Sequence, residues 1–181
     1  KKILLKSYSK KNLESSLYNA CFKHVLNHVY KKDIFSDIGY LKPLYFDNKI
    51  FYSNDREFLI RMCLNGKKNF VIEKILYKMQ THKNSYTGSR KNIIRIRYEH
   101  IGIANFFLDN YSELSIEQKK ILKLFKVHNL TILFILQIFS FQVNDCLTTF
   151  KEGFIEYKLF WFYYIFSRPL LEIAYRISVR Y

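Results

Sequence analysis

Apolar residues recur at helical spacing in the first half of the chain. Over residues 12–29 an apolar side chain falls at every fourth position, which predicts an amphipathic helix, and a connecting loop is expected over residues 33–48. A second helix is predicted to begin at Asn54, because Glu57 three residues later completes the pattern of a capping box. The apolar stripe of this second helix is formed by Phe58, Leu59, Met62 and Cys63.

A corner with a glycine separates the second predicted helix from a third. Gly66 lies just past the last apolar position, where glycine can end a helix in the left-handed conformation at little cost. Asn69 is placed to cap a helix that continues to Met79. The pattern therefore predicts a helical hairpin, whose basic residues are Lys67 and Lys68 at the corner and Lys74 and Lys78 on one side.

The pattern changes period in the middle of the chain. Residues 94–98 alternate between apolar and basic side chains, which predicts a short strand with one basic face. A helix is expected within residues 101–108. Ser115 and Gln118 then form a second capping box, which opens a long apolar helix towards Phe139.

Aromatic and β-branched residues dominate the C-terminal part. Over residues 141–166 they flank the turn signal Lys151-Glu152-Gly153, which favours a β-hairpin. Pro169 suits the first turn of a last helix. These elements together predict a mainly helical protein with one β-hairpin.

Charge is distributed unevenly along the 181 residues. Thirty Lys and Arg against 15 Asp and Glu give a net charge of +15. Residues 1–98 carry 21 basic and 7 acidic residues, a net charge of +14, whereas residues 99–181 carry 9 and 8. Because such a chain repels itself unless a polyanion relieves the repulsion, we expect a polyanionic partner for the first half.

Few patterns suggest catalysis. The chain has no glycine-rich phosphate loop and no nucleophile elbow. Cys21, His24 and His28 lie within two helical turns, but a fourth ligand is missing nearby, so a surface or core-edge helix is favoured over a metal site. Three widely spaced cysteines predict reduced thiols. We expect a protein that is not an enzyme and has no cofactor or metal.

Apolar runs are short. Residues 130–139 and 159–166 are the most apolar, and each falls below the roughly 20 residues that a membrane helix needs, so no membrane span is expected.

Basic residues gather at the N-terminal arm, at the corner after Gly66, on the third predicted helix and over residues 90–97. Arg binds phosphates with two hydrogen bonds and Lys neutralises them, so the mixture fits a phosphate backbone, although a solvated face is the alternative for any single pair. His82, Tyr86 and Tyr98 are of the kinds that stack on unpaired bases. The predicted RNA-binding residues are Lys1, Lys2, Lys6, Lys10, Lys11, Arg61, Lys67, Lys68, Lys74, Lys78, Arg90, Lys91, Arg95, Arg97, Arg168, Arg176 and Arg180.

The stretch FLIRMCLNGKKNFVIEKILYKM, residues 58–79, resembles the first helical hairpin of the universal family of ribosomal protein number seven of the small subunit. Arg168 and Pro169, followed by Ala174, resemble the family's entry into its fourth helix. The departures resemble those of a mitochondrial version: an added N-terminal helix, an insertion, and a hairpin poor in basic residues. The residues that carry the resemblance are Phe51, Ser53, Leu59, Ile60, Gly66, Lys67, Lys68, Glu73, Ile75 and Tyr77.

The resemblance implies a mainly α fold, a helical bundle with a protruding β-hairpin and an N-terminal helical extension. It also implies a domain division and a function. Residues 1–48 would hold the basic arm, the added helix and a loop, and residues 49–181 the ribosomal-protein-like domain, with an insertion at about 84–115 and the β-hairpin at about 141–166. The protein would bind the 3′ major domain of small-subunit rRNA in the mitochondrial matrix and organise the head of the subunit. Its neighbours would be other small-subunit proteins, including number nine, with mRNA and exit-site tRNA nearby.

Two rival functions are weighed. An RNA-processing or DNA-cleaving enzyme encoded in an organelle genome would be equally basic and aromatic, but it would need a cluster of metal-binding acids, and none is visible in the sequence. A peripheral membrane protein would use the C-terminal half, which is rich in Phe and Tyr, but the near-neutral charge of that half argues against attraction to anionic lipid. Within residues 141–166 the net charge is −1, so this segment is expected to contact protein rather than RNA, or else to fill the core of its own domain.

Overall fold

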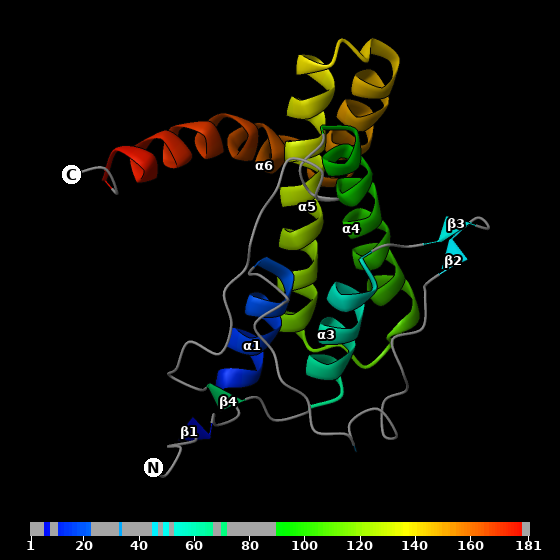
Figure 1. Ribbon diagram of the computed structural model, residues 1–181, viewed down its shortest axis with the longest axis vertical. Coiled ribbons are helices and arrows are strands. Elements are labelled where there is room, and N and C mark those ends of the chain that lie inside the picture. The colour runs from blue at the N-terminus through cyan, green and yellow to red at the C-terminus, as the bar shows by residue number, and fades with distance from the viewer. Residues whose placement is uncertain are drawn as a thin grey trace.

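The protein is mainly helical, as its pattern predicts (Figure 1). The computed structural model describes the backbone of residues 6–7, 11–22, 33, 45–46, 49–50, 53–66, 70–71 and 90–178, and the side chains of 16–22, 33, 53–66 and 92–167. The helices are α1 (Lys11–Phe22), α3 (Asn54–Leu64), α4 (Arg90–Asn110), α5 (Ile116–Phe139) and α6 (Val143–Ser178). The strands form two antiparallel pairs, β1 (Lys6–Ser7) with β4 (Phe70–Val71) and β2 (Tyr45–Phe46) with β3 (Lys49–Ile50).

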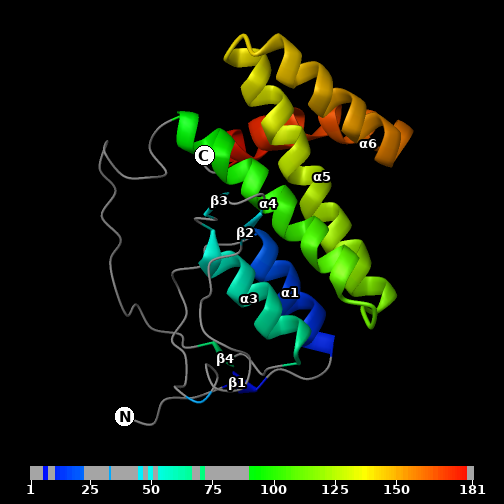
Figure 2. The same ribbon diagram turned by 90° about the vertical axis from the view of Figure 1, so that its right-hand side faces the viewer.

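Helix α5 is the centre of the arrangement, and it packs against α1, α4 and α6. It begins at the predicted capping box: the Ser115 hydroxyl accepts from the Gln118 amide at 3.1 Å, and the Gln118 side chain accepts from the Ser115 amide at 2.8 Å. Its end at Phe139 is also confirmed. Helices α1 and α3 lie side by side near the start of α5, whereas α6 lies at its other end (Figures 1 and 2).

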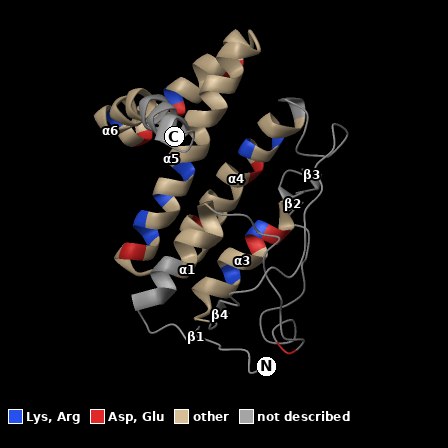
Figure 3. Cartoon of the chain, turned by 60° about the vertical axis from the view of Figure 1, so that its left-hand side comes forward, with Lys and Arg blue, Asp and Glu red and all other residues tan. Residues whose placement is uncertain are grey.

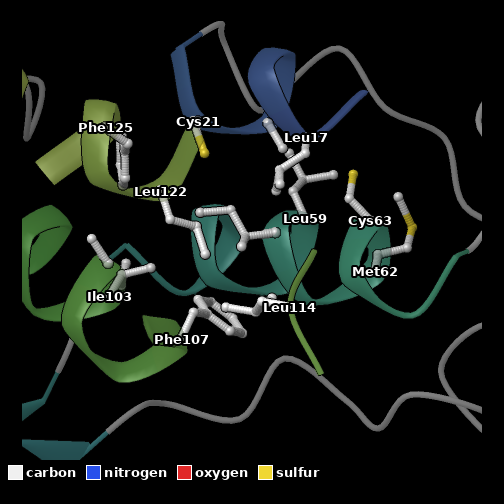
Figure 4. Packing of buried hydrophobic residues seen from close by; sticks show 13 residues of the cluster. Leu17, Cys21, Leu59, Met62, Cys63, Ile103, Phe107, Leu114, Leu122 and Phe125 are labelled. Atoms are coloured by element: carbon white, nitrogen blue, oxygen red, sulfur yellow. The ribbon is translucent and has the colours of Figure 1, made fainter. Parts of the chain in front are cut away.

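The main core forms where α1, α3, α4 and α5 meet (Figure 4). Leu59, Met62 and Cys63 of the predicted α3 stripe are buried there, as are the α1 residues Leu17 and Cys21. Phe58, the remaining residue of the stripe, is buried as well. Ile103 and Phe107 of α4 join this core, so the predicted insertion at 84–115 contains a core helix. The predicted N-terminal helix is confirmed as far as Phe22 and packs on the rest of the protein, while residues 23–29 lie outside the described residues.

The strand predicted at residues 94–98 is wrong, because these residues belong to α4. Ile94 and Ile101 lie two helical turns apart on α4. Ile101 forms an apolar cluster with Leu130 and Leu133 of α5, and Ile94 packs against this cluster. An alternation of five residues fits either period, and burial against α5 selects the helix.

The β-hairpin predicted at 141–166 is also wrong, because α6 covers residues 143–178. Apolar residues 143, 147, 150 and 154 recur at intervals of four, three and four residues, which is helical spacing. The aromatic and β-branched composition favours a strand instead, and packing against α5 selects the helix. The expected turn at Gly153 lies inside the helix. The direction of α6 changes instead at Lys158, where φ is 47° and ψ is −129°, so the predicted helix start at Pro169 is wrong as well.

The two ends of α3 differ in how well they are predicted. The capping box of Asn54 and Glu57 is wrong: Ser53 precedes the helix without a side-chain cap, because its hydroxyl donates to Glu99 at 2.8 Å. The left-handed Gly66 is confirmed, with φ of 67°. Residues 70–71 form β4 rather than the first turn of a helix from Asn69, and the rest of that predicted helix lies outside the described residues.

Candidate nucleic-acid interface

Helix α3 ends in an exposed corner directly before two lysines. The Asn65 amide donates to the Arg61 carbonyl at 3.0 Å, and the Gly66 amide donates to the Cys63 carbonyl at 3.1 Å. These bonds close the last turn, and the left-handed Gly66 then turns the chain out of the helix. Lys67 and Lys68 follow at once in the sequence and lie outside the described residues.

The corner lies at the end of the bundle where α4 joins α5. Tyr111, in the connection between those two helices, has its hydroxyl pKa raised by burial, and it lies beside Arg61, Glu57 and Asn65. Tyr111 also packs against the core cluster that contains residues of α3. The end of α3 and the beginning of α5 are therefore neighbours.

Exposed lysines at the beginning of α5 form a second basic group, which the sequence analysis missed. Lys119 and Lys123 are exposed and lie one helical turn apart. Lys120 pairs with Glu117 at 2.8 Å. Figure 3 shows basic positions in blue near the beginning of α5. The spacing of Lys119 and Lys123 is the signal that could have identified them. These lysines lie at the same end of the bundle as Gly66.

Arg61 makes a contact inside α3. Its guanidinium donates twice to the Glu57 carboxylate, from Nε at 2.7 Å and from Nη2 at 2.9 Å, and lies over the ring of Phe58. Only 16% of its side chain is exposed. Arg61 thus stabilises α3 through an ion pair spaced four residues apart, which the sequence also shows.

Arg95 and Arg97 lie on α4, towards the opposite end of the bundle. Arg95 pairs with Glu99 at 3.4 Å but keeps 46% of its side chain exposed. Arg97 donates to the Asn129 side-chain oxygen of α5 at 3.0 Å. The structure therefore does not bring these arginines together with the corner at Gly66.

A buried polar cluster holds α4 against its neighbours. Asn129 Nδ2 donates to the Phe125 carbonyl at 2.8 Å, which orients the amide so that its oxygen faces Arg97 and His100. His100 Nδ1 lies 3.1 Å from that oxygen and therefore carries the proton. Burial, together with the charges of Arg56 and Arg97, lowers the pKa of His100 to about 3, so its ring is neutral near pH 7.

Arg56 has a structural contact that the sequence analysis did not identify. Its Nη1 donates to the carbonyls of Ala20 and Cys21, at 2.6 and 2.9 Å, in the last turn of α1. Burial lowers the pKa of Arg56. An arginine early in a helix is no signal for this contact, because its partners are 35 residues or more away in the chain.

Metal-site chemistry gains no support from Cys21. It points into the core beside Leu17 and Leu59, and burial raises the pKa of its thiol (Figure 4). His24 and His28 lie outside the described residues. In the part of the chain that the structure describes, no group of three His, Cys, Asp or Glu residues is placed to hold a metal ion.

The other predicted RNA-binding residues are dispersed. Tyr98 is 47% exposed, and its hydroxyl accepts from Gln137 at 2.8 Å. Lys6 belongs to β1, Lys11 opens α1, Arg90 and Lys91 open α4, and Arg168 and Arg176 belong to α6. The predicted sites outside the described residues are Lys1, Lys2, Lys10, Lys67, Lys68, Lys74, Lys78 and Arg180.

Helix α5 has the length and the apolar composition of a membrane-spanning helix. Half of its most apolar 18-residue window is buried inside the protein, and its buried residues include Lys126, Asn129 and Gln137. Packing in the core accounts for this composition.

Comparisons with protein-family models, with curated proteins and with solved structures find no match to this chain.

Proposed function

We propose that the protein is a structural, rRNA-binding component of the small subunit of the mitochondrial ribosome, of the type of ribosomal protein number seven. The observation that carries the proposal is the end of α3, where the exposed, left-handed Gly66 leads directly into Lys67 and Lys68. This corner belongs to the half of the chain with a net charge of +14. Its ligand is the phosphate backbone of the 3′ major domain.

The lysines of α5 add basic side chains at the end of the bundle where α3 stops. Lys119 and Lys123 are exposed at the end of the bundle where α3 stops. Lysines neutralise phosphates as point charges without a fixed geometry, so two groups on neighbouring helix ends suit a backbone that curves across them. Arg61 acts indirectly, because its pair with Glu57 stabilises the last turns of α3 before the corner.

Charge reversal at the corner tests the proposal. The full chain and its Lys67→Glu/Lys68→Glu variant are titrated with a transcript of the 3′ major domain of mitochondrial small-subunit rRNA. Loss of two phosphate contacts should lower the affinity by at least about tenfold, and should reduce the slope of log affinity against log salt by roughly 1.4 to 1.8. Helix content, measured by circular dichroism, should stay unchanged.

Two further variants give the comparison. Lys119→Glu/Lys123→Glu should weaken binding as well, whereas Lys151→Glu/Lys158→Glu makes the same charge change on exposed positions of α6 and should bind almost as wild type. At 0.15 M salt, charges further apart than about 8 Å are largely screened, so distance from the RNA separates the variants. Equal losses in all three variants would reduce the interaction to unspecific attraction, and unchanged binding of the Lys67→Glu/Lys68→Glu variant would refute the proposal.

A further inference from the structure

Exposed apolar side chains concentrate at one end of the molecule. Of the 14 exposed large hydrophobic residues among those described, 11 fall between residues 138 and 166. Six of them define what we call the apolar face. They are Val143, Leu147 and Phe154 before the change of direction in α6, and Leu159, Tyr163 and Phe166 after it. Such residues are normally buried, so their clustering marks a contact surface.

The residues of this apolar face follow helical spacing. Val143, Leu147 and Phe154 share one side of the first part of α6, and the remaining three share one side of the second part. Phe154 contacts Phe162 edge-on across the change of direction, with ring centroids 5.7 Å apart. This aromatic contact links the first part of α6 to the second, and no residue of α6 belongs to the main core among the described residues. Figure 2 shows α6 beyond α1 and α3.

The exposed area is that of a protein interface. With about 150 to 250 Å² for a fully exposed large apolar residue, the six residues of the apolar face, which are 44% to 82% exposed, present roughly 600 to 900 Å². The largest apolar patch on an ordinary monomer is about 300 to 600 Å². A stable protein contact covers about 800 Å² on each partner.

The local charge excludes two kinds of partner. Residues 141–166 carry a net charge of −1 in a chain of net charge +15. Glu152 and Glu156 face the buried Lys126 of α5, so the acidic groups here are partly neutralised within the protein. A phosphate backbone gains little from such a surface, and an anionic membrane needs basic residues beside the apolar ones.

We propose that this apolar face docks a neighbouring protein of the same ribosomal particle, one that presents an apolar and nearly uncharged helix or strand surface. The inference rests on the proposed function for the identity of the particle, and on the exposure, area and charge of residues 138–166 for the kind of partner. The tyrosine and the two phenylalanines of this face supply large contact area at little cost in side-chain entropy, as in the centres of protein interfaces.

Site-specific photo-cross-linking tests this inference. Benzoylphenylalanine is placed at Leu147 or Tyr163, one position in each half of the apolar face, in chains assembled into small subunits and purified with them. Ile116 is the matched control, because it is 73% exposed but lies at the other end of α5. Both positions on the apolar face should cross-link to the same protein, at an apolar segment identified by mass spectrometry, and position 116 should not.

Uncharged polar substitutions complete the test. Leu147→Asn/Tyr163→Asn should keep the melting temperature and the affinity for the rRNA transcript, but should lose at least about tenfold in the yield of that partner. Ile116→Asn, which adds no charge beside Lys119, should retain it. Cross-links to rRNA, lipid, a second copy or other residues of this chain would overturn the inference. If the wild-type chain neither enters small subunits nor binds the transcript, the proposed function fails instead, so the two failures are distinguishable.

Discussion

Gly153 lies inside a helix, where glycine is normally unfavourable, and its neighbour Trp161 explains its presence. A Cβ atom at position 153 would overlap the indole ring, whose Nε1 donates to Thr131 at 3.1 Å. Gly153→Ala should therefore lower the free energy of unfolding by about 1 to 3 kcal/mol, despite the better helix propensity of alanine. Urea denaturation measures the change. If Gly153→Ala instead stabilises the protein, the indole does not occupy the space described.

Gly66 provides the contrasting case. Nothing lies within 4 Å of a Cβ atom there, but φ is 67°. Gly66→Ala should cost about 1 to 2 kcal/mol through the backbone alone, and Gly66→Asn less, because asparagine tolerates this conformation.

His100 makes stability dependent on pH. Its folded pKa of about 3 lies below the unfolded value of 6.5, so the unfolded state binds the additional proton between these values. The contribution of neutral His100 to the free energy of unfolding is fully present above pH 6.5. It is lost as the pH falls towards 3, at up to about 1.4 kcal/mol per pH unit. Denaturation of wild type and His100→Gln at pH 7, 6, 5 and 4 measures it. Glutamine donates to Asn129 without titrating, so an equally steep decline in that variant would assign the effect to other groups.

At the scale of the element, the capping box of α5 is a local device whose contribution can be isolated. Ser115→Ala removes the hydroxyl that accepts from the Gln118 amide and should cost about 1 kcal/mol. Ser112→Ala, an exposed position in the preceding turn, is the control and should change stability by less than about 0.5 kcal/mol. Thermal melts followed by circular dichroism compare the two, and equal effects would remove the special role of the cap.

Elements with local determinants were predictable, and those with distant partners were not. The start and end of α5 follow from Ser115, Gln118 and a long apolar run, all within the helix itself. In α6 the deciding contacts are made to α5, such as Trp161 with Thr131 and Glu156 with Lys126, whereas the local aromatic composition favours a strand.

The residues of the candidate interface also divide into those that the sequence reveals and those whose role depends on distant partners. The lysines after Gly66 were visible in the sequence, and so was the i, i+4 pair of Arg61 with Glu57. The bond from Arg97 to Asn129 links positions 32 residues apart, so its internal role appears only once α4 and α5 are packed. A basic residue alone does not tell whether its partner is a phosphate or the fold.

For the whole molecule, the net charge of +15 predicts opposite effects of salt on the free protein and on its RNA complex. Raising NaCl from 50 to 300 mM screens repulsion within the free chain and should raise its melting temperature, by about 2 to 4 °C per kcal/mol relieved. The same change should dissociate the complex with rRNA. Scanning fluorimetry and anisotropy measure the two effects. A melting temperature that falls with salt would mean that attractive pairs outweigh the repulsion.

The burial of α1 against α3 and α5 leaves α1 partly uncovered while the chain is being synthesised. Helix α1 is made before the two helices that cover it, and α5 begins only at Ile116. At about 5 to 20 residues per second, synthesis of the intervening chain takes roughly 5 to 20 seconds. During that interval the apolar side of α1, with Leu17 and Cys21, lacks its partners on α5, and a chaperone that binds short apolar helices has time to hold it until α5 arrives.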